Sequence, residues 1–467
     1  MGGRSEHVAV KLQCTGCGRE VGLHEPRPFS CPAAVEGDDI DHVLVRRLDP
    51  SVPFPVQPDV NPYLGFSRLM SQPYRAAALG LPPTAVETVV RTLDEAIGRV
   101  DGGGFVTTPW AEQVALARRV GASDIRLWAK DETGNVSGSH KARHLMGVMI
   151  HLLLAEHAGL TDAKNRAPLA IASCGNAALA AAVVAAAAAW PLEVFVPTDA
   201  DPVVLSRLHA LGASVNACPR DGQPGDPCYR ALTAAVQRGA VPFTVQGSDN
   251  GLAVEGGLTL GYELAHQVRQ GPGQLDVLVI QVGGGALGSA CVHALRDAVA
   301  RGVLPHMPRI CTVQTTGAWP LRRAHARVVQ RAVGEIDLPS SPRERADALR
   351  HRPAEDIERA LRHAATHRAA YMWPWEGVPH SIAHGILDDE TYDWWSLVEG
   401  MVQTGGWPIV ADEQTLAAAH TAVRETTEVL ASPTGTAGVA GVIHMAGEGS
   451  LRPGEIVGVL LTGRARA

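Results

Sequence analysis

Lysine is scarce in this chain of 467 residues. Only Lys11, Lys130, Lys141 and Lys164 are present, so 37 of the 41 basic residues are arginines. Arginine keeps its proton at any working pH, whereas lysine can lose it and act as an amine nucleophile that forms a Schiff base. A lysine in a distinctive local sequence is therefore a candidate for a chemical role that arginine could not fill.

Excess positive charge and apolar leader segments are absent as well. The 48 acidic residues outnumber the 41 basic ones, so the net charge of −7 favours neither a nucleic acid nor an anionic membrane as partner. The longest uncharged stretch, residues 167–192, is mostly alanine, and we predict a buried helix there rather than a membrane span. Residues 1–13 lack the apolar segment of a secretory signal, and eight scattered cysteines favour a reduced, cytoplasmic setting.

Short apolar runs and helical patterns alternate along most of the chain. We predict strands at 125–129, 169–173, 192–197, 275–282, 309–313 and 456–461, and helices at 84–99, 141–158 and 413–429, with an alanine-rich helix before 192. This alternation is typical of an α/β fold in which parallel sheets are flanked by helices. Residues 319–370 are dense in Arg, His, Glu and Ala, which predicts a charged helical insertion with solvated histidines.

Lys141 follows a loop of small polar residues. A predicted strand ends near Lys130, the sequence Ser137-Gly138-Ser139-His140 comes next, and Lys141 opens a predicted helix. The positive end of a helix dipole favours the uncharged amine, which makes Lys141 a candidate Schiff-base former. The alternative is a surface lysine at an ordinary helix start.

Two further loops of small residues each follow a predicted strand and open a helix. The first is Ser173-Cys174-Gly175-Asn176-Ala177, whose backbone N–H groups suit a carboxylate or phosphate, although an ordinary turn with an Asn cap has the same pattern. The second is Gly283-Gly284-Gly285-Ala286-Leu287-Gly288, where three glycines let the backbone close around a phosphate. It lacks the Lys-Ser/Thr of a Walker loop, and a dinucleotide fold would leave the lysine loop unexplained.

Together these motifs resemble the pyridoxal-phosphate enzymes of fold type II, a group that includes threonine synthase, the threonine and serine dehydratases and the tryptophan synthase β chain. The resemblance covers residues 61–462, in the expected order. Its other landmarks are Asn61-Pro62-Tyr63, Thr108-Pro109, Lys130-x-Glu132, Glu255-Gly256 with Thr259 and Glu263, and Val459-Leu460-Leu461-Thr462-Gly463.

The resemblance implies two three-layer domains with parallel sheets and a small cysteine-containing N-terminal appendage. The implied ranges are 1–60 for the appendage, 61–245 for the smaller domain with the Schiff-base lysine, and 246–467 for the larger domain with the cofactor phosphate site. It implies that pyridoxal 5'-phosphate is bound by Lys141, by Asn176, by the loop of Gly283, Gly284, Gly285, Ala286 and Leu287, and by Thr462 at the ring nitrogen. Ser173, Cys174, Gly175, Asn176 and Ala177 would bind the substrate carboxylate.

Two departures from the family pattern stand out. His140 precedes Lys141, as in tryptophan synthase β chains, where threonine synthases and dehydratases have Phe. Cys14-x-x-Cys17 with Cys31 resembles the zinc-ribbon-like start of some threonine synthases, but Ala34 stands near the place of the fourth cysteine. We expect no metal and a ribbon held by packing. The alternative is zinc with His24 or His42 as fourth ligand.

The implied activity is β-elimination or β-replacement on a small amino acid, as in threonine synthase. A Ser/Thr ammonia-lyase, a synthase of an unusual amino acid and a non-catalytic cofactor-binding regulator are the alternatives. The family is usually homodimeric. The sequence itself identifies neither the amino acid nor the role of His140.

Overall fold

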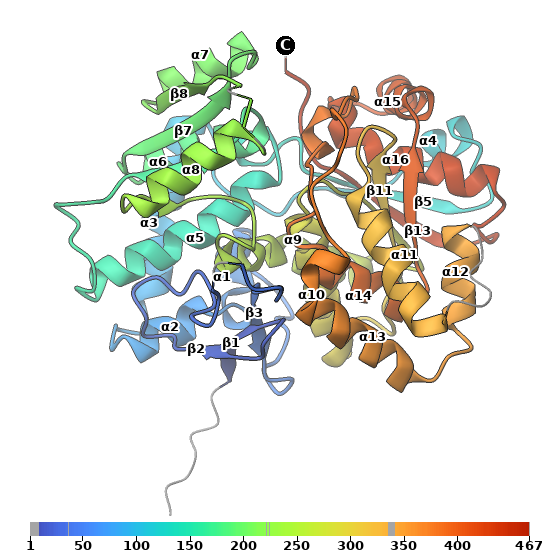
Figure 1. Ribbon diagram of the computed structural model, residues 1–467, viewed down its shortest axis with the longest axis horizontal. Helices are drawn as coiled ribbons and strands as arrows, with labels where there is room; N and C mark the ends of the chain where they lie inside the picture. The colour runs from blue at the N-terminus through green and yellow to red at the C-terminus, as the bar shows by residue number, and fades with distance from the viewer. Residues whose placement is uncertain (1–8, 36, 221, 224, 335–340, 467) are drawn as a thin grey trace, which may run out of the picture.

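The computed structural model describes residues 9–466 except 36, 221, 224 and 335–340. Residues 1–8, part of the range predicted to lack a secretory signal, lie outside the described residues. Figure 1 shows two lobes side by side, with mostly green segments in the left lobe and mostly yellow to red segments in the right. The predicted α/β class is confirmed, because two of the three sheets are largely or wholly parallel and carry helices.

The larger lobe is built on a six-stranded sheet in the order β12-β11-β10-β13-β5-β4, in which only β4 is antiparallel. Every residue of β10 and β13 is buried, as expected where helices cover both faces of a parallel sheet. Helices α4, α15 and α16 pack on one face, and α9, α10, α11 and α14 form the core on the other. The strands are β4 (Trp110–Glu112), β5 (Arg126–Asp131), β10 (Val277–Gln281), β11 (Arg309–Thr315), β12 (Pro408–Ala411) and β13 (Ile456–Leu461). The helices are α4 (Val114–Arg119), α9 (Gly251–Gln270), α10 (Ala286–Ala300), α11 (Pro320–Val333), α14 (Trp394–Thr404), α15 (Glu413–Thr426) and α16 (Pro433–Gly447).

The smaller lobe holds a four-stranded parallel sheet in the order β8-β7-β6-β9. Its strands are β6 (Leu169–Ala172), β7 (Leu192–Pro197), β8 (Ser214–Cys218) and β9 (Val241–Pro242). Its helices are α2 (Gln72–Ala78), α3 (Ala85–Asp101), α5 (Lys141–His157), α6 (Asn176–Ala187), α7 (Pro202–Ala210) and α8 (Pro227–Gln237), after the single turn α1 (Pro62–Gly65). The alanine-rich α6 is a mostly buried helix, as predicted, and small side chains let it pack closely against α3 and α5. Among the described residues, no helix is both long enough and apolar enough to span a bilayer.

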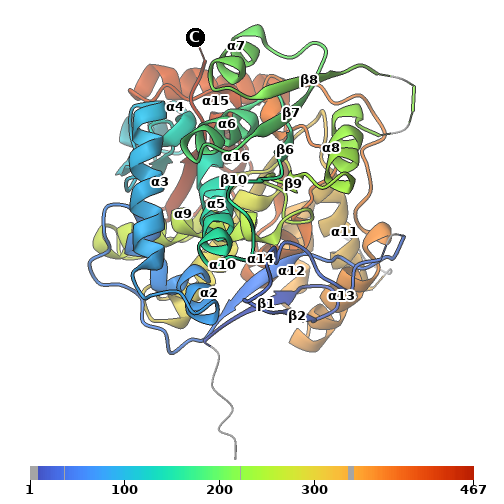
Figure 2. The same ribbon diagram turned by 90° about the vertical axis from the view of Figure 1, so that its left-hand side faces the viewer.

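The N-terminal appendage is an antiparallel sheet in the order β2-β1-β3. It comprises β1 (Val10–Cys14), β2 (Glu20–Val21) and β3 (Leu44–Leu48), and β3 packs against α9. Figure 2 shows β1 and β2 low in the molecule, and the segment before β3 contacts α13 (Ala354–Thr366), where the N–H of Asp41 donates to the carbonyl oxygen of Ala365 at 2.8 Å.

The segment 319–370 contains α11, α12 (Pro342–Leu349) and α13, in agreement with the predicted helical insertion. The prediction of solvated histidines is wrong for His325, which is 1% exposed on the apolar face of α11 beside Leu321 and Val328. Burial lowers the pKa of His325 to about 3, so this imidazole is neutral.

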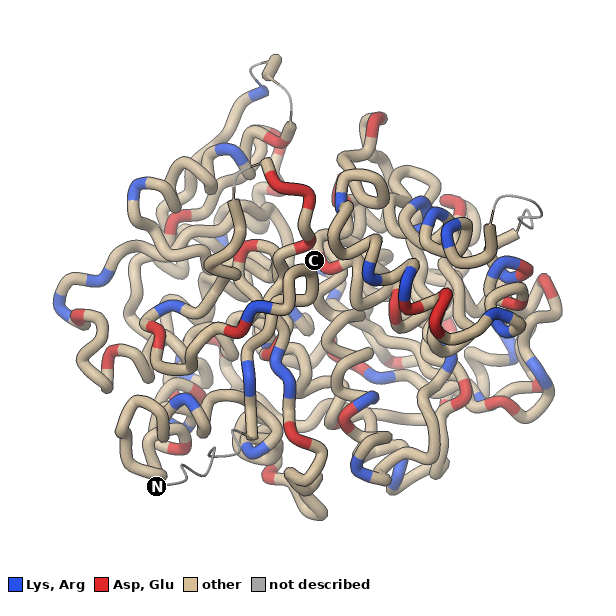
Figure 3. The backbone as a smooth tube through the Cα atoms, turned by 60° about the horizontal axis from the view of Figure 1, so that its bottom comes forward, with Lys and Arg blue, Asp and Glu red and all other residues tan. Residues whose placement is uncertain are grey.

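Figure 3 shows basic and acidic residues interspersed along the chain, with no large region of one sign in that view.

The predicted domain boundary at residue 245 remains a prediction. The strands of the larger sheet come from both sides of that boundary. Strands β4 and β5 precede residue 245, yet β5 pairs with β13 in the larger sheet, from Arg126 opposite Ile456 to Asp131 opposite Leu461. The chain therefore begins the smaller lobe with α1 to α3, enters the larger lobe with β4 and β5, completes the smaller lobe and returns to the larger one.

A buried ion network joins the lobes at this crossing. The Arg143 guanidinium on α5 donates to Glu132 (Nε to Oε2, 2.7 Å) and to Glu263 on α9 (Nη1 to Oε1, 2.7 Å). Lys130 at the end of β5 donates to the other oxygen of Glu263 at 2.7 Å. The side chains of Arg143, Lys130, Glu132 and Glu263 in these pairs are completely buried. Thr108 adds a hydroxyl that donates to Glu132 at 2.5 Å, so the network contains several of the family landmarks.

Replacing Arg143 with Met should lower the free energy of unfolding by about 3–5 kcal/mol, because two carboxylates are left buried without their shared cation. Urea denaturation followed by circular dichroism measures this. Arg126→Gln is the matched control, since the Arg126–Glu112 pair is solvent-exposed and its loss should cost less than about 1 kcal/mol. Equal effects of the two substitutions would contradict the assigned importance of the network.

Candidate active site

A cavity of about 490 Å³ opens where β6 and β10 end. Residues from both lobes line it, which is where parallel α/β sheets place ligands. All of the predicted site residues line this one cavity: Lys141, Ser173, Cys174, Gly175, Asn176, Ala177, Gly283, Gly284, Gly285, Ala286, Leu287 and Thr462. The structure thus brings together loops that are widely separated in the chain, while their roles remain predictions.

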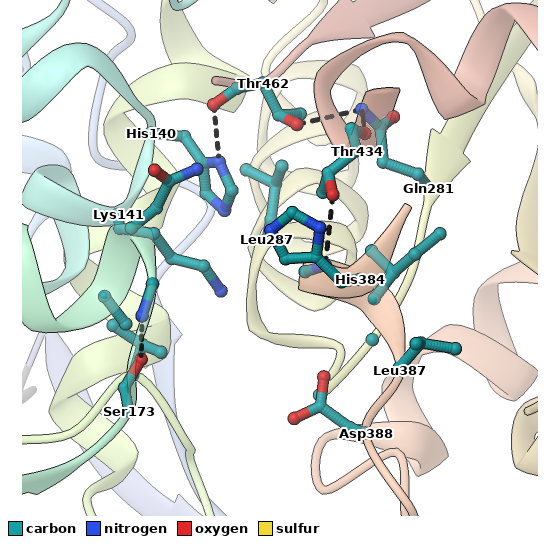
Figure 4. A pocket seen from close by; sticks show the side chains of 18 of the residues that line it. His140, Lys141, Ser173, Gln281, Leu287, His384, Leu387, Asp388, Thr434 and Thr462 are labelled. Atoms are coloured by element: carbon teal, nitrogen blue, oxygen red, sulfur yellow. Dashed lines mark hydrogen bonds between the residues drawn. The ribbon is translucent and has the colours of Figure 1, made fainter. Parts of the chain in front are cut away.

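Lys141 is the first residue of α5, and Figure 4 shows its side chain extending into the cavity. Burial lowers the pKa of its amine, and the carboxyl groups of Asp388 and Asp393 partly oppose that shift. The neighbouring His140 is buried, its ring nitrogen Nδ1 lies 3.0 Å from the carbonyl oxygen of Thr462, and burial and Lys141 keep its pKa well below the ordinary value. His144, one turn along the helix, has its pKa lowered to about 3 by burial. Two neutral imidazoles therefore flank an amine that loses its proton readily.

The glycine loop has no room for side chains. A Cβ at Gly283 would lie 2.1 Å from Oδ2 of Asp388 and 3.0 Å from Cα of Ile386. Gly285 is the N-cap of α10 and adopts φ +98°, a left-handed conformation that other residues rarely take. The first-turn N–H groups of α10 emerge from this loop, and such groups bind anions such as phosphate.

The Ser173–Ala177 loop leads from β6 into α6, with Asn176 as the first residue of that helix. The Asn176 carboxamide oxygen accepts a hydrogen bond from the guanidinium of Arg466, and its nitrogen lies 2.7 Å from where a Cβ of Gly463 would stand. A side chain at position 463 would therefore clash with the carboxamide of Asn176, and glycine avoids this clash. Residues 173–177 line the cavity, and their binding of a substrate carboxylate remains a prediction.

Thr462 follows β13 and has a defined partner. Its hydroxyl oxygen accepts a hydrogen bond from Nε2 of Gln281 at 2.9 Å, as Figure 4 shows. Because the same amide nitrogen also donates to the carbonyl groups of Gly435 and Leu460, the orientation of Gln281 is fixed. The proton of the Thr462 hydroxyl is then free to be donated to a ligand atom in the cavity.

Among the lining residues that the sequence analysis did not identify are Gln281, His384 and Asp388. Gln281 carried a usable signal, because it is the one polar residue at the end of an otherwise apolar strand. His384 and Asp388 lie in an irregular segment before α14, without a motif or a period. Burial raises the pKa of Asp388 to about 6, opposed by Lys141 and by the N–H of Gly284. A buried carboxyl with a raised pKa opposite an amine is a common arrangement in catalytic sites.

Comparisons with known proteins identify a family and a fold. A family model described as "Pyridoxal-phosphate dependent enzyme" matches residues 103–463. Threonine synthase of Methanosarcina acetivorans is 27% identical over 219 residues, which cover 46% of this chain and 49% of that protein. Human L-serine dehydratase/L-threonine deaminase is 27% identical over 214 residues, which cover 46% of this chain and 58% of that protein. The chain thus spans about half the length of these curated relatives.

Solved structures match over more of the chain. Maize serine racemase superimposes with a TM-score of 0.56 at 18% identity, covering 81% of this chain and 94% of that one. Processed threonine deaminase isoform 2 from Solanum lycopersicum gives a TM-score of 0.55 at 15% identity, covering 82% and 85%. At such identities the likeness shows the fold alone.

Stability should depend on pH through Asp388. Its folded pKa of about 6 lies above the ordinary 3.8, so the native protein binds the extra proton, and the free energy of unfolding falls as pH rises from about 4 to about 6. The Asp388→Asn variant has no titrating carboxyl at this position, so its free energy of unfolding should not show this fall with pH. In the protein freed of bound ligands, the variant should match the wild type near pH 4 and exceed it by up to about 3 kcal/mol at pH 7. Urea titrations across that range measure the difference, and a pH-independent difference would contradict the assignment.

Proposed function

Because the chain belongs to the pyridoxal-phosphate-dependent enzymes, we propose that it is a lyase or synthase that acts on a small amino acid by β-elimination or β-replacement, in the manner of threonine synthase. One observation carries this proposal: the amine of Lys141 and the paired Thr462–Gln281 line the same cavity as the glycine loop.

The residues of the cavity fit pyridoxal phosphate. The loop from Gly283 to Leu287 would hold the phosphate with backbone N–H groups, and its tight packing leaves no room for a Cβ at Gly283, which would clash with Asp388 and Ile386. Lys141 would attach the cofactor through its amine. Asn176 would bind the ring hydroxyl, and Thr462 would donate its free proton to the ring nitrogen.

When bound, pyridoxal phosphate supplies a sink for the electrons left at the substrate Cα after proton removal. The N–H groups of residues 173–177 bind and orient the substrate carboxylate. The amine of Lys141, which lines the same cavity, would serve as the base that takes the Cα proton. Its lowered pKa suits that role.

Thr462 influences which reaction follows. A hydroxyl donor leaves the ring nitrogen largely unprotonated, whereas an acidic side chain would protonate it. The weaker electron sink favours prompt loss of a β-substituent over transamination. This supports elimination or replacement as the reaction class.

The carboxyl group of Asp388 is suited to donating a proton to the leaving group of the substrate. Its buried carboxyl lines the cavity and interacts with Lys141, and its pKa of about 6 lets it hold or donate a proton near neutral pH. We assign to it the hydrogen bond to the leaving hydroxyl or to the incoming nucleophile. The same carboxyl suits a Ser/Thr ammonia-lyase, which is therefore the second candidate function. A homodimer and a cytoplasmic setting remain predictions.

Lys141→Ala should abolish the visible absorption band of the covalently attached cofactor and lower turnover by at least about 10³-fold, since attachment and proton transfer both need this amine. Purified holoenzyme is incubated with serine, threonine and O-phosphohomoserine while ammonia, 2-oxo acids and amino-acid products are followed by mass spectrometry. Lys164→Ala is the matched control, because Lys164 is solvent-exposed.

The product pattern decides between the candidates. Ammonia and a 2-oxo acid from serine or threonine indicate an ammonia-lyase, and a new amino acid indicates a synthase. An unchanged absorption band in Lys141→Ala would refute the lysine assignment, and cofactor binding without any turnover would favour a regulatory protein.

Gly283→Ala should weaken pyridoxal phosphate binding by about 10–100-fold, corresponding to about 1–3 kcal/mol of overpacking in the phosphate loop. Equilibrium dialysis of the cofactor-free protein measures the dissociation constant. Gly134→Ala is the control, because a Cβ there meets nothing within 4 Å. Equal affinities of the two variants would contradict the assigned phosphate site.

A further inference from the structure

Four metal-ligating side chains meet in the N-terminal appendage. Cys14 ends β1, Cys17 lies in the turn after it, Cys31 comes from the loop that follows β2, and His42 lies just before β3. One ligand atom from each lies within 4.8 Å of every other. The Sγ atoms of Cys17 and Cys31 are 3.5 Å apart, and Sγ of Cys14 lies 3.4 Å from Nδ1 of His42.

We propose that these four residues, Cys14, Cys17, Cys31 and His42, bind one structural zinc ion. Three thiolates and one imidazole are soft to borderline donors, which select zinc over magnesium or calcium. Around a tetrahedral zinc with bonds of about 2.0–2.3 Å, neighbouring ligand atoms are separated by about 3.5–3.8 Å. The Cys17–Cys31 and Cys14–His42 pairs are near that separation, and the four ligand atoms all lie within 4.8 Å of one another. Binding releases the thiol protons to solvent.

The surroundings of the cluster match those of a zinc site. The backbone N–H of Cys17 donates to Sγ of Cys14 at 3.5 Å, and the N–H of Ala33 donates to Sγ of Cys31 at 3.4 Å. Such bonds stabilise negative charge on sulfur. Nε2 of His42 lies 3.0 Å from Oδ2 of Asp38, which leaves Nδ1 for the metal. A carboxylate behind a ligating histidine fixes the ring orientation and makes the nitrogen a better donor.

The tertiary structure distinguishes the two histidines that the sequence left open. His24 has a side chain that is 73% exposed, and its Nε2 lies 3.5 Å from Glu25 rather than near the thiols. His42 contacts Cys14 directly. The fourth ligand therefore comes from the segment before β3 instead of from position 34, and the expectation of a metal-free ribbon gives way to this proposal.

A zinc ion would cross-link a sheet that has little core of its own. Only Cys14, Cys31 and Leu44 form the buried cluster beside the site, and β2 has two residues. Asp41, next to His42, accepts a hydrogen bond from the indole of Trp394 at 3.1 Å. Trp394 follows Asp393, one of the carboxyl groups that act on Lys141. The metal would thus fasten the appendage to the wall of the candidate active site.

The test measures metal in the holoenzyme purified from cells grown with zinc. Mass spectrometry of the digested protein should find about one zinc per chain, and a mercurial reagent should release it to a coloured chelator. Cys31→Ser and His42→Ala should bring the content close to zero, while His42→Cys should restore it. His24→Ala is the matched control and should keep the full content.

A second measurement needs no variant. Cobalt added to chelator-treated wild-type protein should give the intense visible bands and sulfur charge-transfer absorption of a tetrahedral thiolate site. A wild-type protein that holds neither zinc nor cobalt would overturn the proposal. So would a Cys17–Cys31 disulfide found by mass spectrometry in the freshly purified protein, or a His42→Ala variant with full zinc content. None of these outcomes depends on the reaction that the enzyme catalyses.

Discussion

The buried pairing of Arg143 with Glu132 and Glu263 is the constraint on which the arrangement of the two lobes depends. Arg143 lies two residues after Lys141 on α5, and its partners lie after β5 and on α9. One guanidinium therefore connects the start of the helix that carries the reactive lysine with two elements packed against it. Charges buried this deeply are tolerated only when each is paired, so the network admits one relative placement of these elements. Tyr63 strengthens it by donating its hydroxyl proton to the carbonyl oxygen of Arg143.

This network also explains the family landmarks that have no chemical role in the cavity. Thr108, Glu132, Thr259 and Glu263 were noted for their order along the chain, and three-dimensionally they surround one arginine. Lys130, whose local sequence resembles part of the lysine motif, is a structural member of the same cluster. Scarcity of lysine thus indicated two buried residues with opposite uses. The amine of Lys130 donates to Glu263, whereas the amine of Lys141 lines the cavity and interacts with the carboxyl groups of Asp388 and Asp393.

Much of the fold was predictable because parallel strands and their loops have local signatures. The strands at 192–197 and 456–461 match the structure to the residue, and the three small-residue loops line one cavity. The features that the sequence did not predict depend on contacts with residues far away in the chain. Asp388 and His384 belong to an irregular segment, His325 is buried by the tertiary packing of α11, and the choice between His24 and His42 depends on which one the sheet brings to Cys14. Each of these is a property of contacts between remote segments.

The position of β13 has a consequence for how the chain acquires its structure. This strand lies between β10 and β5 and follows both in the chain, so β5 has no partner on that side until β13, hundreds of residues later, has been made. Contacts between such distant segments close large loops and form slowly, and an open apolar edge can pair wrongly in the meantime. Thr462 follows β13 directly, so the same late event that completes the sheet supplies the last wall of the cavity. The nascent protein is thus unable to hold its cofactor fully until the larger sheet is closed.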